Sequence, residues 1–247
     1  MNVILVGATK GMGRAIARKM AERGDRLFLL GRNPEELDRS AADLGVRGGA
    51  TDTIGIAWCD LEHADGFEDA LDAAWQDLGH VDAVVVTAAM FGTQDALEDD
   101  TELARRLLTV NFANTVTFCE HVRKRLLAQD NGGTLCVFSS VAGDRGRKPV
   151  AIYGASKAGL SHYLESLDHK FHDQGLRTIC VKPGFVKTGM TAGLKPPPFA
   201  GEPEQVADDV LKAIDRGTPL IYTPGIWQLV MLAIQHAPRA VMRRVGF

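Results

Sequence analysis

Short apolar runs rich in valine, isoleucine and leucine alternate with longer segments of helical periodicity from the N-terminus to about residue 223. This alternation indicates βαβ units and a parallel sheet with helices on both faces. Most of the runs are continuously apolar, as is typical of strands that are buried on both sides. Strands are predicted near 2–7, 26–31, 53–59, 81–87, 133–139, 176–182 and 219–223. Helices are predicted near 12–24, 34–44, 64–78, 101–129, 152–174 and 203–216.

The 247 residues show no repeat and no change of composition that would mark a domain boundary, so we expect one α/β domain. Two connections, 89–100 and 187–201, are predicted to be irregular, and the second contains Pro196-Pro197-Pro198. Both follow the carboxyl end of a strand, where open α/β sheets bind their ligands. We therefore expect 187–201 to be a substrate loop.

A glycine-rich turn joins the first predicted strand to the first helix, with the sequence Gly7-Ala8-Thr9-Lys10-Gly11-Met12-Gly13. Glycine allows positive φ angles and close approach of a phosphate, while the free N–H groups and the dipole of the helix favour negative charge. The turn therefore predicts a pyrophosphate site. Close packing of helix on strand is the alternative explanation, and the spacing differs from G-x-G-x-x-G.

The second predicted strand ends at Gly31-Arg32, where a carboxylate would instead accept the ribose 2′-hydroxyl of NAD. Arg32 offers a charged fork to a 2′-phosphate, and Lys10 adds a second cation. Together they favour NADP(H), although both are also common as solvated surface charges. Asp60, after the third strand, is a candidate for the adenine amino group or for an N-cap of the next helix.

Tyr153 and Lys157 are four residues apart, which places them on one face of a predicted helix. A phenol has an unperturbed pKa of about 10, and lowering it to about 7 takes roughly 4 kcal/mol of phenolate stabilisation. A fixed ammonium group one turn away can supply much of this. Ser140, at the end of the fifth strand, is expected to hydrogen-bond the substrate oxygen. Asn111 lies in an apolar helical stretch and is expected to kink the helix and to hold a water linked to Lys157.

These residues resemble the short-chain dehydrogenase/reductase family from Val3 to about Tyr222. The resemblance implies a doubly wound, Rossmann-type sheet of seven parallel strands and a homodimer or homotetramer built partly on the helices that hold Asn111 and Tyr153. It implies catalytic roles for Asn111, Ser140, Tyr153 and Lys157. The cofactor contacts that it implies are Gly7, Thr9, Lys10, Gly11, Met12, Gly13, Arg32, Asp60, Leu61, Tyr153, Lys157, Pro183, Gly184, Val186 and Thr188.

One motif departs from the family pattern, because Val86-Thr87-Ala88-Ala89 stands where Asn-Asn-Ala-Gly is usual. Thr87 either replaces the missing amide or the loop packs differently. Within the family, 140–147 and 223–247 are similar to decaprenylphosphoryl 2-keto-arabinose reductases, which act on a lipid-linked keto sugar. A broader branch of bacterial reductases explains the tail equally well.

The bulk properties exclude several other classes. A net charge of −3 gives no basic surface for nucleic acid. The four cysteines Cys59, Cys119, Cys136 and Cys180 are far apart in apolar runs, which indicates buried thiols. His169 and His172 have no third ligand candidate, so no metal is expected. The N-terminus has no leader pattern and no run reaches membrane-spanning length, so a cytoplasmic protein is expected.

The segment after about residue 225 is apolar over 226–234 and then basic, with Arg239, Arg243 and Arg244 after Pro238. One expectation is burial against the sheet or a partner subunit. The other is a helix on the inner face of the membrane, with apolar side chains among the acyl chains and arginines at anionic headgroups.

Three functions are open. The first is an NADP(H)-dependent oxidoreductase, most simply a ketoreductase of a bulky or lipid-linked keto substrate. The second is a reductase of a small or carrier-bound ketone, for example a 3-oxoacyl thioester. The third is a nucleotide-sensing protein without turnover, which is disfavoured because Ser140, Tyr153 and Lys157 are all present.

Overall fold

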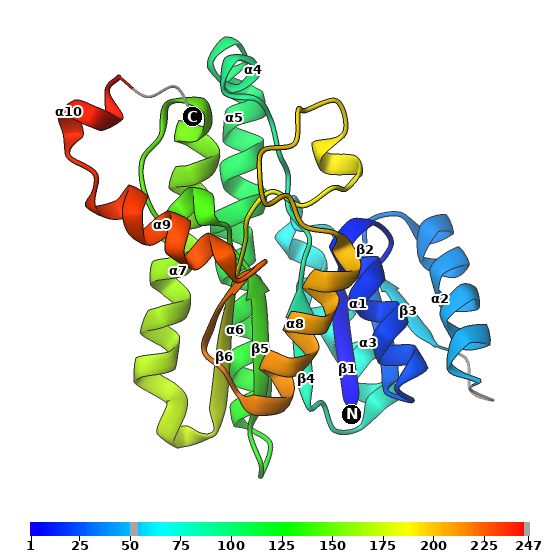
Figure 1. Cartoon of the computed structure of the whole chain (residues 1–247). Helices are drawn as coiled ribbons and strands as arrows, with labels where there is room; N and C mark the ends of the chain where they lie inside the picture. Colours follow the sequence, from blue (N-terminus) through cyan, green and yellow to red (C-terminus); the bar gives the residue numbers. More distant parts are fainter. Residues whose placement is uncertain (50–53, 245–247) are drawn as a thin grey trace.

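A computed structural model describes residues 1–49 and 54–244 and contains a sheet of seven parallel strands in the order β3-β2-β1-β4-β5-β6-β7 (Figure 1). The strands are β1 Asn2–Val6, β2 Arg26–Gly31, β3 Gly55–Trp58, β4 Ala83–Val86, β5 Gly133–Phe138, β6 Leu176–Pro183 and β7 Leu220–Thr223. All seven predicted strands occur. The predicted start of the third strand, residue 53, lies outside the described residues.

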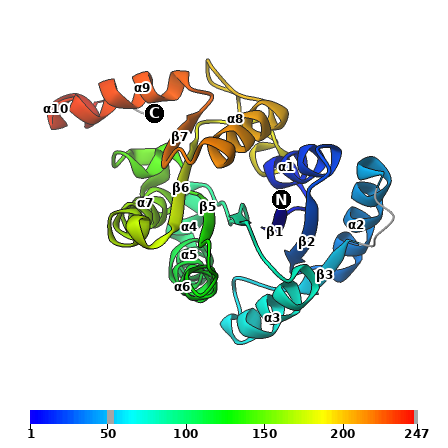
Figure 2. The same ribbon diagram turned by 90° about the horizontal axis from the view of Figure 1, so that it is seen from below.

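Helices cover both faces of the sheet, as predicted (Figure 2). Helices α1, α2 and α8 pack on one face and α3, α6 and α7 on the other. Their bounds are α1 Gly11–Glu22, α2 Pro34–Gly48, α3 Phe67–Leu78, α6 Asn114–Leu127, α7 Ala151–Phe171 and α8 Pro203–Arg216. Short 3₁₀ helices lie at Ala64–Gly66, Val141–Gly143, Lys148–Val150, His172–Gln174 and Gly189–Thr191.

The continuously apolar strands supply both cores at once. In β1, Ile4 and Val6 point into the core under α3, α6 and α7, whereas Val3 and Leu5 point into the core under α1, α2 and α8. All four side chains are at most 1% exposed. Successive side chains of a strand leave opposite faces of the sheet, so a strand with helices on both sides has no polar face.

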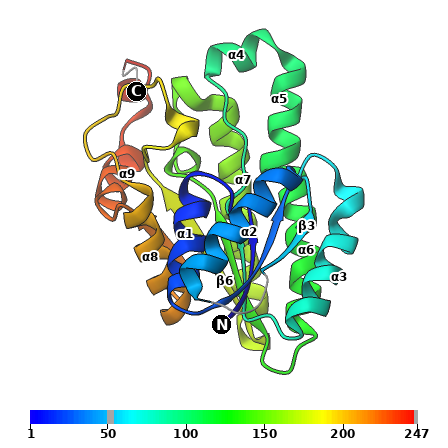
Figure 3. The same cartoon turned by 90° about the vertical axis from the view of Figure 1, so that its right-hand side faces the viewer.

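The prediction that 89–100 is irregular is wrong, because it contains α4 Gln94–Asp99. Thr93 caps α4 by accepting the N–H of Ala96, and Asp100 caps the next helix, α5 Thr101–Leu108. These helices rise beyond the carboxyl edge of the sheet (Figure 3). Thr93 and Asp100 are N-cap residue types seven positions apart, and together they indicate two short helices. The spacing of the apolar residues alone did not indicate them.

The single helix predicted over 101–129 is interrupted by a π-helical turn, Thr109–Ala113. Asn111 lies in this turn, which agrees with the prediction that the helix is distorted at Asn111. The residue is buried, with 1% exposure. Thr115 donates its hydroxyl to the Val110 carbonyl at 2.6 Å, which satisfies one carbonyl at the interruption. A π-turn often marks a functional position.

The C-terminal segment forms α9 Ile226–His236 and α10 Arg239–Met242, separated at Pro238. Trp227 and Met231 of α9 are buried against Val141 and the side chain of Tyr222. One face of the segment is therefore covered by its own chain. Among the described residues, no helix is both long enough and apolar enough to cross a membrane.

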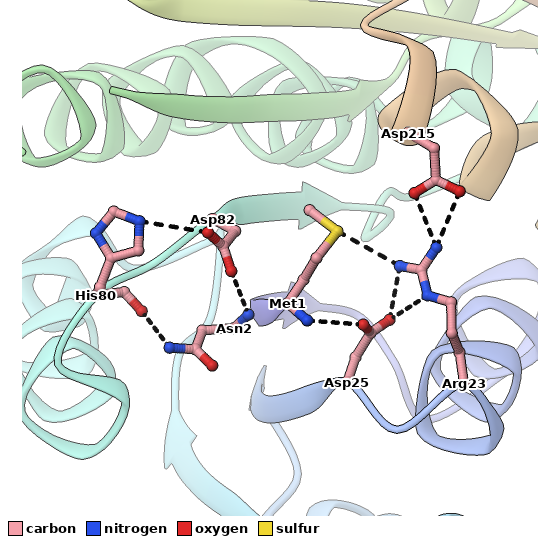
Figure 4. A network of polar contacts seen from close by, with 7 residues as sticks. All are labelled: Met1, Asn2, Arg23, Asp25, His80, Asp82 and Asp215. Carbon is pink, nitrogen blue, oxygen red and sulfur yellow. Dashed lines mark hydrogen bonds and ion pairs between the residues drawn. The ribbon is translucent and has the colours of Figure 1, made fainter. Parts of the chain in front are cut away.

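A network of polar contacts lies at the amino edge of the sheet, opposite the glycine-rich turn (Figure 4). Asp25, just before β2, accepts from the Met1 amino group at 2.9 Å and from the Arg23 Nε at 2.8 Å. Arg23 also donates to Asp215 at the end of α8, at 2.9 Å. The side chain of Asp25 is 4% exposed, so Arg23 compensates a carboxylate that has little contact with water.

We expect Arg23→Gln to lower the free energy of unfolding by about 1–3 kcal/mol, because the charged partner of a buried carboxylate is lost. Urea unfolding measures this, with Arg39→Gln as the control, since Arg39 pairs only on the exposed surface of α2. Equal stability of the two variants would contradict the role of Arg23.

Candidate active site

The strand order reverses between β1 and β4, and a cleft opens at the carboxyl ends of these two strands. Its volume is about 420 Å³. Doubly wound sheets bind nucleotides at such a switch point. The cleft is lined by Val6, Gly7, Thr9, Lys10, Gly11, Met12, Gly13, Gly31, Arg32, Asn33, Glu36, Cys59, Asp60, Leu61, Thr87, Ala88, Ala89, Met90, Val110, Thr188, Gly189 and Met190.

Most of the cofactor residues predicted from the sequence lie in this cleft. They are Gly7, Thr9, Lys10, Gly11, Met12, Gly13, Arg32, Asp60, Leu61 and Thr188. Tyr153 and Lys157, which were also predicted to contact the cofactor, do not line it. Pro183, Gly184 and Val186 do not line it either, and lie at the end of β6 and in the chain that follows. A further wall of the cleft, formed by Ala88, Ala89 and Met90 after β4, was not predicted, because only the neighbouring position of β1 and β4 brings it there.

The glycine-rich turn is packed too closely for side chains at two of its positions. A Cβ atom on Gly13 would lie 2.2 Å from the Gly7 carbonyl oxygen, and Gly7 itself has φ +89°. Close packing and ligand binding therefore need the same glycines. No side chain caps the start of α1, where Lys10 is the N-cap residue. The free N–H groups of this helix end face the cleft and suit a pyrophosphate.

Thr87, which stands where the family motif usually has an amide, hydrogen-bonds the start of the glycine-rich turn. Its hydroxyl lies 3.0 Å from the Val6 carbonyl oxygen and 3.1 Å from that of Gly7, so it donates to this pair. Its main-chain N–H also donates to Val6 at 2.9 Å. The side chain thereby ties the end of β4 to the turn that begins the cleft.

The two candidate cations for a 2′-phosphate have no competing partners. Lys10 and Arg32 are exposed at the cleft, and in the described part of the chain neither forms a salt bridge. Two carboxylates, Glu36 and Asp60, also line the cleft, and Glu36 is paired with Arg39 at 3.0 Å. Glu62 is paired with Arg106 at 2.6 Å, and this hydrogen bond holds its pKa below the usual range. A phosphate at this cleft would therefore meet two cations that form no salt bridge within the described residues.

Asp60 belongs to a turn at the cleft and does not cap the following helix. Its Oδ1 accepts the N–H of Glu62 at 3.0 Å, and the 3₁₀ helix that follows begins after His63 without a side-chain cap. The second carboxylate oxygen of Asp60 has no protein partner in the described residues. The position therefore suits an amino group of a ligand such as adenine.

Ser140, Tyr153 and Lys157 come together where β5 ends beside α7. Ser140 is buried and accepts the Ala142 N–H at 3.1 Å, while the Lys157 Nζ lies 5.9 Å from the centre of the Tyr153 ring. The Tyr153 ring packs edge-to-face on Phe91, with ring centres 5.3 Å apart. Tyr153 and Lys157 therefore lie on the same side of α7, as their four-residue spacing predicted. The contact of Tyr153 with Phe91 was not predicted.

Burial governs the pKa values of both titratable groups. It raises the pKa of Tyr153 to about 12, and the neighbouring Ser140 hydroxyl opposes this shift. It lowers the pKa of Lys157 to about 8. The expected lowering of the Tyr153 pKa is not present in the structure, because the effect of burial outweighs that of the hydrogen bond with Ser140. Tyr153 is consequently a neutral phenol at pH 7 and is prepared to donate a proton.

Asn111 uses its whole side-chain amide on the loop after β4. Its Oδ1 accepts the Met90 N–H at 2.7 Å and its Nδ2 donates to the Met90 carbonyl at 2.8 Å. This clamp fixes the wall of the cleft. The water linked to Lys157 stays a prediction.

Two clusters of polar side chains near the site were not predicted from the sequence. Ser139 bonds the Lys157 carbonyl at 2.9 Å and the Ser161 hydroxyl at 2.7 Å, which fixes α7 on β5. Asp144 accepts from Lys182 at 2.6 Å and from the Tyr222 hydroxyl at 2.9 Å. The Ser139-Ser140 doublet was a usable signal for the first cluster, whereas the second joins residues 38 and 78 positions apart.

Trp227 of α9 lies behind the segment after β6. A Cβ atom on Gly184 would meet its indole nitrogen at 2.1 Å, so Gly184 is small because the ring occupies that space. The same indole donates to the Phe199 carbonyl at 3.1 Å and thereby holds the end of the predicted substrate loop. The C-terminal helix is thus part of the surroundings of the site.

All four cysteines are buried free thiols, as predicted, and burial raises the pKa of Cys59 to about 12. They are not activated nucleophiles. Within 1–49 and 54–244, no three His, Cys, Asp or Glu side chains gather as a group that could hold a metal ion. The side chains gathered at the candidate site are the Tyr153 phenol, the Lys157 ammonium group and the Ser140 hydroxyl.

Sheet topology and cleft define a Rossmann-type α/β protein. The sequence profile of the short chain dehydrogenases matches residues 1–198. An uncharacterized oxidoreductase of Mycobacterium tuberculosis is 30% identical over 98% of this chain and 96% of its own. Carbonyl reductase family member 4 of Xenopus tropicalis is 30% identical over 83% of this chain and 87% of its own. The chain therefore belongs to the short-chain dehydrogenase/reductase family of oxidoreductases.

The fold is shared with solved structures of the family. A short-chain dehydrogenase from Sphingobium yanoikuyae, in complex with NADPH, superposes with a TM-score of 0.80. It is 24% identical, and the match covers 94% of this chain and 93% of that one.

The pKa of Lys157 generates a prediction for the pH profile. We expect kcat/KM for NADPH to fall as the pH rises through about 8, because the buried ammonium group loses its proton there. The sign follows from the lowered pKa, since the charged form persists below it. Initial rates at limiting NADPH between about pH 6.5 and 9.5 report this group in the free enzyme. A profile that stays flat over this range would contradict the assignment.

Proposed function

We propose that this protein is an NADPH-dependent ketoreductase in which Tyr153 donates the proton. The observation that carries the proposal is the neutral Tyr153 phenol beside Ser140 and the Lys157 ammonium group, at the edge of the sheet where the cleft opens. A nucleotide-sensing protein would not need these three groups together. We infer reduction as the favoured direction, because Arg32 and Lys10 at the cleft favour NADP(H).

The residues of the cleft fit NADP(H). The uncapped start of α1 suits the pyrophosphate, and Arg32 with Lys10 suits the 2′-phosphate. Gly31 stands at the end of β2, where a carboxylate would repel that phosphate. The NADPH in the Sphingobium yanoikuyae relative supports the same choice. When bound, NADPH supplies a hydride to the carbonyl carbon of the substrate.

The side chains complete the reduction at the oxygen. Ser140 donates a hydrogen bond to the carbonyl oxygen, and Tyr153 transfers its phenolic proton to the same oxygen as the C=O π bond breaks. The alcohol is released and the remaining phenolate takes a proton from solvent. Lys157 stabilises the phenolate meanwhile, which is worth most in a site shielded from water.

For the substrate, we propose a bulky or lipid-linked ketone. The loop 187–201 exposes Met190, Leu194 and Phe199, at 44%, 38% and 59%, beside the site. Large apolar side chains in an exposed loop are suited to an apolar substrate. The resemblance of 140–147 and 223–247 to decaprenylphosphoryl 2-keto-arabinose reductases supports the lipid-linked version. A carrier-bound ketone such as a 3-oxoacyl thioester is the alternative.

NADPH oxidation against a panel of ketones tests the proposal directly. The panel holds a polyprenyl-phosphate-linked 2-keto sugar, the same sugar without its lipid, a 3-oxoacyl thioester and small aliphatic ketones. Highest kcat/KM for the lipid-linked sugar supports the proposed class, and preference for the thioester supports the alternative. Tight NADPH binding without oxidation of any ketone would count against a reductase.

We also propose a homodimer or homotetramer. Phe112, within the π-turn, is 38% exposed, and its ring lies over Gly159 of α7. Leu108, on the same surface, is 40% exposed. An apolar surface on two neighbouring helices suits a contact between copies.

The proposed contact between Arg32 and the 2′-phosphate can be tested through the preference for NADPH over NADH. Arg32→Ala is expected to weaken NADPH binding by a factor of about 10–150, since a charged bidentate contact contributes about 1.5–3 kcal/mol. The affinity for NADH should change little, because NADH lacks the 2′-phosphate. Fluorescence titration of both cofactors measures this, with Arg39→Ala as the control on the surface of α2. A wild type that prefers NADH would refute the assignment.

Tyr153→Phe keeps the ring and its packing on Phe91 but removes the proton donor. Turnover is expected to fall by about 10²–10⁴ while the Kd for NADPH changes little. Stopped-flow rates at saturating NADPH with the preferred ketone measure the effect. Near-normal turnover of this variant would leave the mechanism without its acid.

A further inference from the structure

The C-terminal helix α9 exposes an apolar stripe to solvent. Ile226, Leu229 and Leu232 are 39%, 65% and 53% exposed, and Ala233 is exposed beside them. Their spacing of three and four residues places them on one face. The opposite face, with Trp227 and Met231, is already buried against the chain's own core. The side chains of the stripe therefore do not take part in the hydrophobic core that holds α9 in place.

The chain that follows this stripe is strongly basic. Arg239, Arg243 and Arg244 are exposed and, among the described residues, form no salt bridge. The sequence has no Asp or Glu after Asp215. The whole chain carries a net charge of −3, so this concentration of positive charge is local.

The loop before Tyr153 adds to the same surface. Arg145 donates to the Ala237 carbonyl at 3.1 Å, and Lys148 donates to the Arg243 carbonyl at 2.7 Å. Both cations therefore lie against the ends of α9 and α10. Arg147 lies between them in the sequence, and its Nε is buried without a hydrogen-bond partner in the described part of the molecule. The one acidic group of this loop, Asp144, is neutralised by Lys182.

We propose that α9 and α10 bind the surface of an anionic lipid bilayer. Figure 1 shows the two helices projecting from the side of the molecule, clear of the sheet. The stripe of Ile226, Leu229 and Leu232 enters the acyl boundary, and Arg239, Arg243 and Arg244 lie at the lipid phosphates. With 11 residues, α9 lies in the plane of the interface and does not cross it.

The positive charge of α10 and the residues after it favours a bilayer, rather than a second copy of this chain, as the partner of this surface. A symmetric dimer through this stripe would cover the apolar side chains, but the segment would offer the three unpaired arginines of each copy no carboxylate. An anionic membrane offers both the apolar layer and the negative charge that this surface lacks.

Binding at the bilayer would act on the site through two existing contacts. Trp227 holds the Phe199 carbonyl of the loop 187–201, and Arg145 joins α9 to the loop between Ser140 and Tyr153. The membrane surface would thus face the entrance of the candidate active site. The membrane proposal does not require a lipid-linked substrate, and stands whether or not the proposed function does.

Sedimentation with vesicles tests it on the full chain. Wild type is expected to sediment with phosphatidylcholine vesicles that contain phosphatidylglycerol, far less with pure phosphatidylcholine, and less at high salt. Leu229→Ser/Leu232→Ser and Arg239→Gln/Arg243→Gln/Arg244→Gln should each weaken binding by about tenfold or more. Val46→Ser and Arg39→Gln are the controls, because these exposed side chains lie on α2 and should leave binding unchanged.

NADPH affinity is measured on every variant and should equal that of wild type, which shows that the fold is intact. Absence of wild-type binding to the anionic vesicles would overturn the proposal. So would a change of molar mass in Leu229→Ser/Leu232→Ser by analytical ultracentrifugation, since the stripe would then be covered by another copy. A catalytically inactive wild type that still binds vesicles would count against the proposed function alone.

Discussion

The Lys157 ammonium group is buried at 2% exposure, and the arrangement of the active site depends on how the fold accommodates it. An isolated charge in the interior is costly, so its Nζ donates to the Phe138 carbonyl at 2.9 Å, at the end of β5. Ser139 then ties the Lys157 carbonyl to the same strand. These contacts fix α7 against the sheet, and with it the position of Tyr153.

Helix α7, which carries Tyr153 and Lys157, is also supported by α4 and by the segment that precedes α4. Gln94 of α4 accepts the Ile152 N–H at 3.2 Å near the start of α7, and Phe91 carries the Tyr153 ring. The loop that presents these residues is held in turn by the clamp of Asn111 on Met90. A residue expected to serve the proton path therefore also serves as the structural link between the π-turn, the cleft wall and the phenol.

The C-terminal helix α9 has one buried face and one exposed face. One face of α9 is buried against the core by Trp227 and Met231, and the other exposes Leu229 and Leu232. Because Trp227 also occupies the space beside Gly184, the segment is anchored at the site while its outer face stays available. Local sequence specified that the segment is apolar and then basic, but which side chains face outward depends on where β6 and β7 place it.

The sequence alone determined the seven strands, the two helical layers, the glycine-rich turn and the Tyr153–Lys157 pair, because these depend on local periodicity and on spacing within one element. The tertiary structure decided the rest. Thr87 meets the glycine turn only because β4 lies beside β1, and Lys182 reaches Asp144 only because β6 lies beside β5. The pKa of Tyr153 rises because packing removes water from the phenol, and no spacing in the sequence measures that loss.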